Sequence, residues 1–316
     1  MSGPVVIAHR GASGYLPEHT LPAKALAYAM GADFLEQDVV ATRDDELIVL
    51  HDLHIDRVSN VADVYPKRVR ADGRYYARDF DLDELRELTI WERMEADGRA
   101  VYPDRFPARS GRFRIHTLAE EIELVQGLNA SSGRVAGIYP EIKGPAWHRD
   151  EGVDVAPLML DILDRYGYRT ASDPVFVQCF DAAEIVRLRR DLGTELALIQ
   201  LIGENDWGES VTDYDALQTD SGLDKIAEVA NGIGPWVEQT YALKGGKPTT
   251  TGLVERAHAH GLAVHPYTFR LDSLPPGFGS FDSLVAFVIG ELGADGLFTD
   301  FPDVARRAID SLKLDD

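Results

Sequence analysis

The 316-residue sequence contains a single cysteine and no long apolar run. A lone thiol, Cys179, cannot form an intrachain disulfide, so cysteine usage favours neither an oxidising nor a reducing compartment. No stretch approaches the roughly 20 apolar residues that cross a bilayer, and residues 1–10 lack a basic region followed by a signal-type apolar segment. We therefore expect a soluble chain without stable membrane insertion.

Basic residues are also scarce. The sequence holds 32 Lys and Arg against 53 Asp and Glu, which gives a formal net charge of −21. Nucleic-acid and anionic-membrane surfaces favour clustered Lys and Arg, so this balance argues against both kinds of partner. An anionic substrate would need a bound cation, or a few placed basic residues, to reverse the sign of the field inside its site.

Short apolar runs alternate with helical patterns along most of the chain, which is typical of βα units and a parallel sheet. A hydrophobic content of 45% over this length suits one large α/β barrel. Nine strand candidates compete for the eight places of a (β/α)8 TIM barrel, so one is wrong or lies outside it, and the glycine-bearing run at 232–236 is the weakest. The candidates are 5–8, 33–38, 47–51, 137–142, 175–180, 196–202, 232–236, 262–268 and 296–299.

The stretch from 53 to 116 breaks this rhythm. It is rich in charge, Tyr, Pro and Gly and offers one plausible helix, at 81–88. We interpret it as an insertion after the third strand that lies over the barrel mouth, within a single barrel domain spanning 1–316.

Titratable side chains stand at the ends of three apolar runs. His9 follows 5–8, His51 follows 47–50, and Glu36 and Asp38 end the run between them. If each run is a buried parallel strand, these side chains meet at the carboxyl edge of one sheet, where α/β folds carry their chemistry. Two imidazoles and two carboxylates in one cleft indicate acid–base work around a metal.

Strand alternation points Glu36 and Asp38 to one side, and likewise Glu141 and Lys143. Two unit charges about 4 Å apart cost roughly 4 kcal/mol at an effective dielectric of 20, so three converging carboxylates need a cation. Oxygen ligands favour calcium or magnesium over zinc. A strand-end glutamate such as Glu36, taken alone, is more often a salt-bridge partner than a metal ligand, and His265 is as easily a core histidine as a site residue.

Eight sequence blocks spread over essentially the whole chain closely resemble the glycerophosphodiester phosphodiesterases, and the long insertion resembles most the periplasmic bacterial branch. The blocks are HRG at 9–11, LPEHT at 16–20, GADFLEQD at 31–38, LHD at 50–52, YPEIK at 139–143, QCFD at 178–181, HPYT at 265–268 and GLFTDFP at 296–302.

The resemblance implies a (β/α)8 barrel that cleaves glycerophosphodiesters to sn-glycerol 3-phosphate and an alcohol, with a periplasmic location favoured over a cytoplasmic one and calcium favoured over magnesium. It also implies roles for particular residues, and His19 departs from the Asn of many relatives, with a role left open. The implied acid–base pair is His9 and His51, the phosphate-binding residues are Arg10 and Lys143, and the metal ligands are Glu36, Asp38 and Glu141.

Several alternatives stay open at this point. The nucleophile is water or the neighbouring glycerol hydroxyl through a cyclic phosphate, and either histidine can start as the base. A phospholipase D-like enzyme on intact lipids, or a surface-binding protein that retains the barrel, would use the same fold. The expected partners are small glycerophosphodiesters, with the oligomeric state left open.

Overall fold

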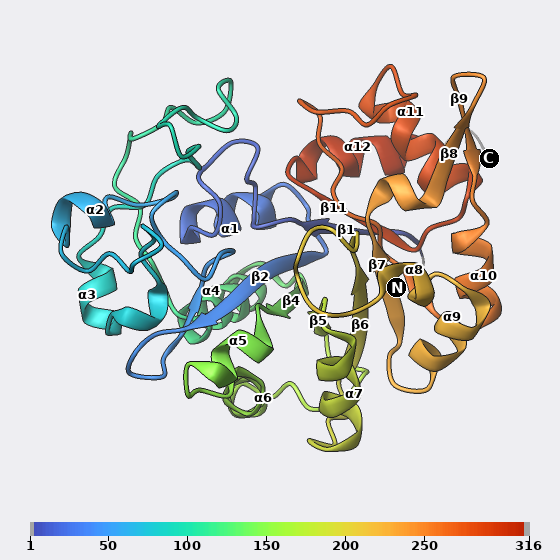
Figure 1. Cartoon of the computed structure of the whole chain (residues 1–316). Coiled ribbons are helices and arrows are strands. Elements are labelled where there is room, and N and C mark those ends of the chain that lie inside the picture. The colour runs from blue at the N-terminus through green and yellow to red at the C-terminus, as the bar shows by residue number, and fades with distance from the viewer. Residues whose placement is uncertain (1–2, 313–316) are drawn as a thin grey trace.

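Eight parallel strands form a nearly closed barrel in the computed structural model, which describes residues 3–312 (Figure 1). Backbone hydrogen bonds such as Phe269 N to Phe298 O, 2.8 Å, close the remaining edge between the last two strands in the chain. The strands, in their order around the barrel, are β10 (Ala263–Val264), β7 (Gly232–Pro235), β6 (Ala197–Ile202), β5 (Phe176–Cys179), β4 (Gly137–Ile142), β2 (Phe34–Ala41), β1 (Val5–Ala8) and β11 (Gly296–Thr299).

The strand candidate that lies outside the barrel is 47–51, not the glycine-bearing 232–236. Here β3 (Leu47–Val49) pairs antiparallel with the end of β2, while β7 takes a barrel place between β6 and β10. The glycine that weakens the β7 pattern has a packing reason. A Cβ on Gly232 would lie 2.6 Å from the Ala263 carbonyl oxygen, so only glycine lets these two strands approach.

Helices surround the barrel and bury their apolar faces against the strands (Figure 1). None of the helices among residues 3–312 is both long and apolar enough to cross a membrane. An exposed hairpin, β8 (Tyr241–Lys244) with β9 (Lys247–Thr250), was not expected from the sequence. The helices are α1 (Leu21–Ala29), α4 (Leu118–Ser132), α5 (Pro145–Asp150), α6 (Val155–Arg165), α7 (Ala182–Arg190), α8 (Tyr214–Leu217), α9 (Asp220–Ala227), α10 (Leu253–Ala259), α11 (Phe281–Val285) and α12 (Pro302–Leu312).

The segment 53–116 lies beside the barrel, drawn in cyan and teal with α2 (Val61–Val64) and α3 (Leu82–Arg86) (Figure 1). Its apolar side chains, the fully buried Phe80 among them, form a cluster that continues onto Val40 and Ile48 of the β2–β3 pair. The helix predicted at 81–88 is thus present but shorter. The division into one barrel domain with an insertion stays a prediction.

Two glycine-to-alanine variants test the close packing of the barrel wall. A Cβ on Gly137 would lie 2.3 Å from the Phe34 ring and 2.5 Å from the Pro174 carbonyl oxygen, so Gly137→Ala should lower the free energy of unfolding by about 1–3 kcal/mol. Gly127, inside α4, has nothing within 4 Å of its added Cβ, so Gly127→Ala should raise it by about 0.5–1 kcal/mol. Urea unfolding measures both, and equal values for the two variants would contradict the packing argument.

Candidate active site

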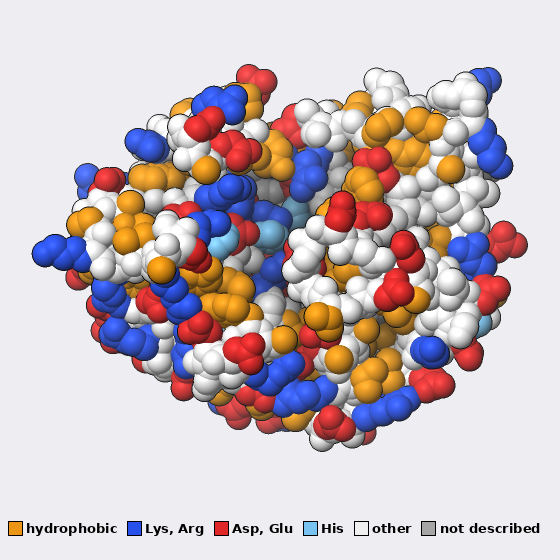
Figure 2. Space-filling model, in the orientation of Figure 1, with side chains coloured by type: hydrophobic (Ala, Val, Ile, Leu, Met, Phe, Trp, Pro, Cys, Tyr) orange, Lys and Arg blue, Asp and Glu red, His pale blue; other side chains and the backbone are white. Residues whose placement is uncertain are grey.

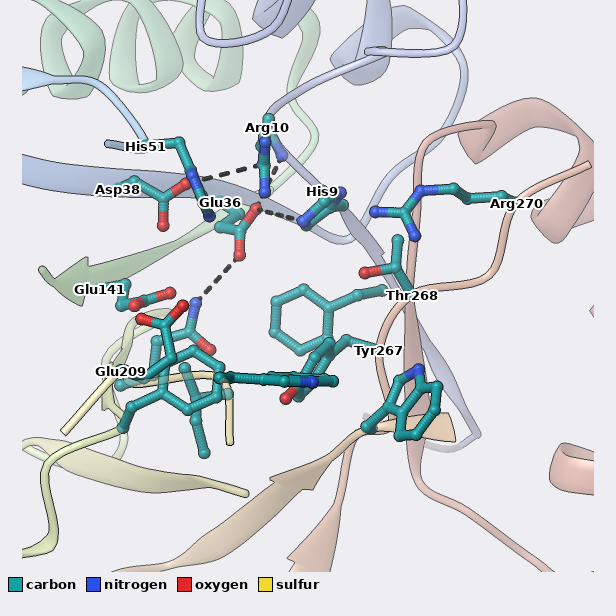
Figure 3. A pocket seen from close by; sticks show the side chains of 16 residues that line it. His9, Arg10, Glu36, Asp38, His51, Glu141, Glu209, Tyr267, Thr268 and Arg270 are labelled. Carbon is teal, nitrogen blue, oxygen red and sulfur yellow. Dashed lines mark hydrogen bonds and ion pairs between the residues drawn. The ribbon is translucent and has the colours of Figure 1, made fainter. Parts of the chain in front are cut away.

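Three buried carboxylates converge from the paired strands β2 and β4 (Figure 3). Glu36 and Asp38 point inward from β2, and Glu141 stands beside Asp38 because the strand register pairs these two residues. One ligand oxygen from each lies within 4.8 Å of the others. The predicted convergence of Glu36, Asp38 and Glu141 is therefore present in the structure.

Burial and mutual repulsion perturb the protonation of this cluster. Burial and the charge of Asp38 raise the pKa of Glu36 to about 8. Burial likewise holds the pKa of Glu141 well above its usual range, although Lys143 acts in the opposite direction. Neutralisation of the carboxylate charge is thus favourable here, and either protons or a bound cation can bring it about.

The donor set fits a hard cation. Asp38 Oδ2 is 2.6 Å from His19 Nε2, whereas the buried Asp38 Oδ1 has no hydrogen-bond partner among residues 3–312. An unpartnered buried carboxylate oxygen is costly unless a ligand completes it. The three acids would offer a cation carboxylate oxygens, which are the ligands that calcium and magnesium prefer.

Each of the two predicted histidines is hydrogen-bonded to a carboxylate. His9 Nδ1 lies 2.6 Å from Asp300 Oδ1, and His51 Nδ1 lies 2.6 Å from Asp52 Oδ1. An ionised carboxylate only accepts hydrogen bonds, so each ring carries its proton on Nδ1 and keeps the Nε2 lone pair free. Burial and nearby cations lower the pKa of His9 to about 4 and that of His51 to about 3, so both rings are neutral at pH 7.

His51 reaches the site by a route that the strand argument did not foresee. It was expected at the end of a parallel barrel strand, as His9 is at the end of β1. Instead β3 runs antiparallel to β2 and returns the chain to the barrel rim. The Leu50 backbone N–H then donates to the Asp38 carbonyl oxygen at 2.8 Å, which sets His51 beside the carboxylates.

The predicted phosphate-binding cations also face the cluster. Arg10 has its Nε 3.8 Å from Asp38 Oδ2, and its Nη1 donates to Glu18 Oε2 at 3.0 Å. Lys143 Nζ lies 2.8 Å from Glu141 Oε1. Arg10 lines the pocket that holds the three carboxylates, whereas Lys143 lines an adjoining hollow beside His51, so the two cations offset the carboxylate charge from different sides.

The pocket between these groups has one polar and one apolar side. It encloses about 290 Å³ and is hollowed into the face shown in Figure 2, where histidine and basic side chains surround the opening. His9, Glu36 and Asp38 line one side, and Tyr267 stands opposite, with Thr268 and Arg270 at the edge (Figure 3). Further apolar lining comes from Phe180, Leu201, Trp207, Trp236 and Phe298.

Sequence reasoning missed most of the groups that hold the predicted residues. Asp300 directly follows β11, so a systematic reading of strand ends would have found it. Asp52 is adjacent to His51, but a histidine–aspartate pair in a loop is too common to carry weight alone. His19, whose role was open, contacts the cluster through Asp38. The sequence pattern did not predict which aromatic residues line the pocket.

Comparison with known proteins places this site in context. The model of the Glycerophosphoryl diester phosphodiesterase family matches residues 9–304. The glycerophosphodiester phosphodiesterase of Haemophilus influenzae is 41% identical over 99% of this chain and 91% of its own length, and that of Treponema pallidum is 36% identical over 96% and 91%. The structure of an Oleispira antarctica phosphodiesterase in complex with the product sn-glycerol-3-phosphate has a TM-score of 0.66 at 20% identity, over 98% of this chain and 97% of that one.

Removing the charge of Glu36 from the carboxylate cluster should stabilise the metal-free protein against unfolding. Because folding raises the pKa of Glu36 from 4.5 to about 8, its carboxyl costs stability progressively as pH rises through that window. Glu36→Gln should therefore raise the free energy of unfolding by about 1–3 kcal/mol at pH 8, with little gain at pH 4.5. Thermal unfolding in chelator at several pH values measures this.

The matched control is another buried glutamate of the same site. Burial alone would raise the pKa of Glu18, but Arg10 and Arg93 hold it well below its usual range. Glu18→Gln breaks these pairs and should destabilise the protein at pH 8 by roughly 3–5 kcal/mol. Loss of stability in both variants would show that the cluster is not repulsive.

Proposed function

The chain belongs to the glycerophosphoryl diester phosphodiesterase family, and from that premise we propose that it hydrolyses glycerophosphodiesters to sn-glycerol 3-phosphate and an alcohol with a divalent metal ion and two histidines. The observation that carries the proposal is the meeting of His9 and His51 with three carboxylates in one pocket. The product bound to the Oleispira antarctica relative supports the assignment of the glycerol phosphate half.

Glu36, Asp38 and Glu141 would hold the metal ion. Calcium is favoured and magnesium suits the same oxygen donors. When bound, the ion would supply electrostatic stabilisation of the negative charge on the phosphodiester. The close approach of the three carboxylates, the raised pKa of Glu36 and the unpartnered Asp38 Oδ1 all favour such a ligand.

Arg10 and Lys143 would bind the nonbridging phosphate oxygens. A phosphodiester monoanion resists attack because its charge repels nucleophiles, and preorganised cations lower that barrier. The backbone N–H of Arg10 donates to Glu36 Oε2 at 2.7 Å, and Lys143 Nζ lies against Glu141. The Arg10 guanidinium, with its Nε 3.8 Å from Asp38 Oδ2, and the Lys143 ammonium are both close to the carboxylates beside which the phosphate would bind.

The two histidines would move the protons. One Nε2 would accept a proton from the nucleophile. The other imidazole, which is neutral in the free protein, would first take up a proton from solvent at its free Nε2 when the phosphodiester monoanion binds, and would then donate that proton to the departing alkoxide. The Nδ1 hydrogen bonds to Asp52 and Asp300 keep both Nε2 atoms available. Attack by water and attack by the neighbouring glycerol hydroxyl both use this pair.

Loss of either imidazole should remove an acid or a base. His9→Ala and His51→Ala should each lower kcat for glycerophosphocholine by about 10²-fold or more, with the melting temperature nearly unchanged. The assay is release of glycerol 3-phosphate. His258→Ala is the matched control, because His258 lies on α10 and pairs with Asp295, which does not line the pocket. Near wild-type turnover in a His9 or His51 variant would make that residue structural.

Metal removal should abolish turnover. Chelation should stop release of glycerol 3-phosphate, and calcium or magnesium should restore it, since the phosphate would otherwise meet three carboxylates. The ion should also raise the melting temperature, because it binds only the folded site. Asp38→Asn should require more metal for half-maximal activity. Full turnover by exhaustively chelated protein would remove the metal from the mechanism.

A further inference from the structure

The carboxylate that holds His51 is itself held by an arginine of the 53–116 segment. Asp52 uses Oδ1 for His51, and its Oδ2 accepts from Arg93 Nη1 at 2.6 Å. Arg93 also donates to both carboxylate oxygens of Glu18, at 2.6 and 3.0 Å. Its side chain is only 11% exposed, so water does not replace these contacts readily.

The same arrangement recurs at the other histidine. Asp300 uses Oδ1 for His9, and its Oδ2 accepts from Arg105 Nη2 at 2.7 Å and also from the barrel-side Arg270 Nε at 2.9 Å. Arg105 is also paired with Asp272 through two hydrogen bonds of 2.7 and 3.0 Å, and its side chain is 4% exposed. One segment outside the barrel thus supplies an arginine to each of the two His–Asp pairs.

A carboxylate bound at one oxygen can still rotate about its bond to the chain, whereas one bound at both oxygens cannot do so without losing a partner. Charge-assisted hydrogen bonds from a planar guanidinium are the strongest means of fixing it. The arginines also keep the acids ionised. Burial alone would raise the pKa of Asp52 and of Asp300, but His51 and Arg93 lower the first, and Arg270, His9 and Arg105 lower the second.

We propose that Arg93 and Arg105 are positioning residues through which the 53–116 segment fixes the tautomer and orientation of His51 and His9. The proposal rests on the proposed function for its kinetic consequence, but the tautomer is a property of the folded protein alone. A fixed carboxylate keeps the imidazole proton on Nδ1, and an imidazole in the other tautomer has no free Nε2 lone pair. Catalytic geometry built on loops needs such support.

A third arginine of the segment provides a matched control. Arg70 also bridges two carboxylates, those of Asp79 and of Glu151 on the barrel side, with hydrogen bonds between 2.6 and 2.9 Å. Neither carboxylate contacts a histidine of the pocket. Arg70→Met therefore removes the same kind of contact between the segment and the barrel without touching either His–Asp pair.

Arg93→Met, Arg105→Met and Arg70→Met are compared as full chains with metal bound. Arg105→Met should lower kcat for glycerophosphocholine by about 10-fold with KM unchanged, the low end of what is typical when a group that orients a ligand or catalyst is lost, because Arg270 still donates to Asp300 Oδ2. Arg93→Met should lower kcat similarly and also raise KM, because Glu18 links Arg93 to the phosphate-binding Arg10. Arg70→Met should leave both constants near wild type.

Nitrogen NMR of 15N-histidine-labelled protein at pH 8 reads the tautomer directly, with signals assigned through His9→Ala and His51→Ala. Arg105→Met should shift the His9 nitrogens toward a tautomer mixture and leave His51 unchanged, and Arg93→Met should do the reverse. Arg93→Lys and Arg105→Lys keep a cationic donor group, so they should restore part of the Nδ1-protonated tautomer. They replace a Met variant that does not fold.

Unchanged tautomers and wild-type kcat in the Arg93 and Arg105 variants would overturn the proposal. An equal loss of kcat in Arg70→Met would also overturn it, because general docking of the segment would then explain the effect. A wild-type protein with fixed Nδ1 tautomers but no hydrolysis of glycerophosphodiesters would instead refute the proposed function and leave the positioning intact.

Discussion

Repulsion among three buried carboxylates is the constraint on which the site depends. Glu36, Asp38 and Glu141 meet at the rim of a barrel in a chain that already carries a net charge of −21. Nearby cations and hydrogen-bond donors offset this concentration of charge, among them Arg10, Lys143 and His19. Even Lys24, fully buried behind β2, directs its ammonium at the Glu36 carbonyl oxygen and the Glu121 carboxylate. These groups compensate only part of the charge, since the pKa of Glu36 stays raised and Asp38 Oδ1 has no hydrogen-bond partner among residues 3–312.

The barrel and the carboxylate cluster were both predictable from sequence, because both follow from local periodicity. Apolar runs of strand length mark the parallel strands, and alternation along β2 fixes Glu36 and Asp38 to one side. His51 faces the site, as predicted. The reason given for its position was wrong, because β3 lies outside the barrel. The weakest strand candidate, β7, proved to be a barrel strand because glycine there permits close approach. The strength of an apolar sequence pattern reflects the side chains of a strand. It does not show how closely the backbones of two strands can approach.

The supporting contacts could not be predicted, because they join segments with no shared pattern. Arg93 and Arg105 lie in a stretch without periodicity, and their partners Asp52 and Asp300 are 41 and 195 residues away. Only the folded chain brings such pairs together. The identity of the metal ion, the roles of the individual site residues and a periplasmic location likewise remain predictions, since they depend on ligands and cellular context.

The pairing of β1 with β11 joins the beginning of the described chain to its end, and His9 is 291 residues from its partner Asp300. Contacts between such distant segments are the last that a growing chain can make. A nascent polypeptide can therefore place Glu36, Asp38 and Glu141 long before it can orient His9. Under the proposed roles, a chain that stops before Asp300 would contain the three carboxylates that bind the metal ion but would lack the carboxylate that orients His9.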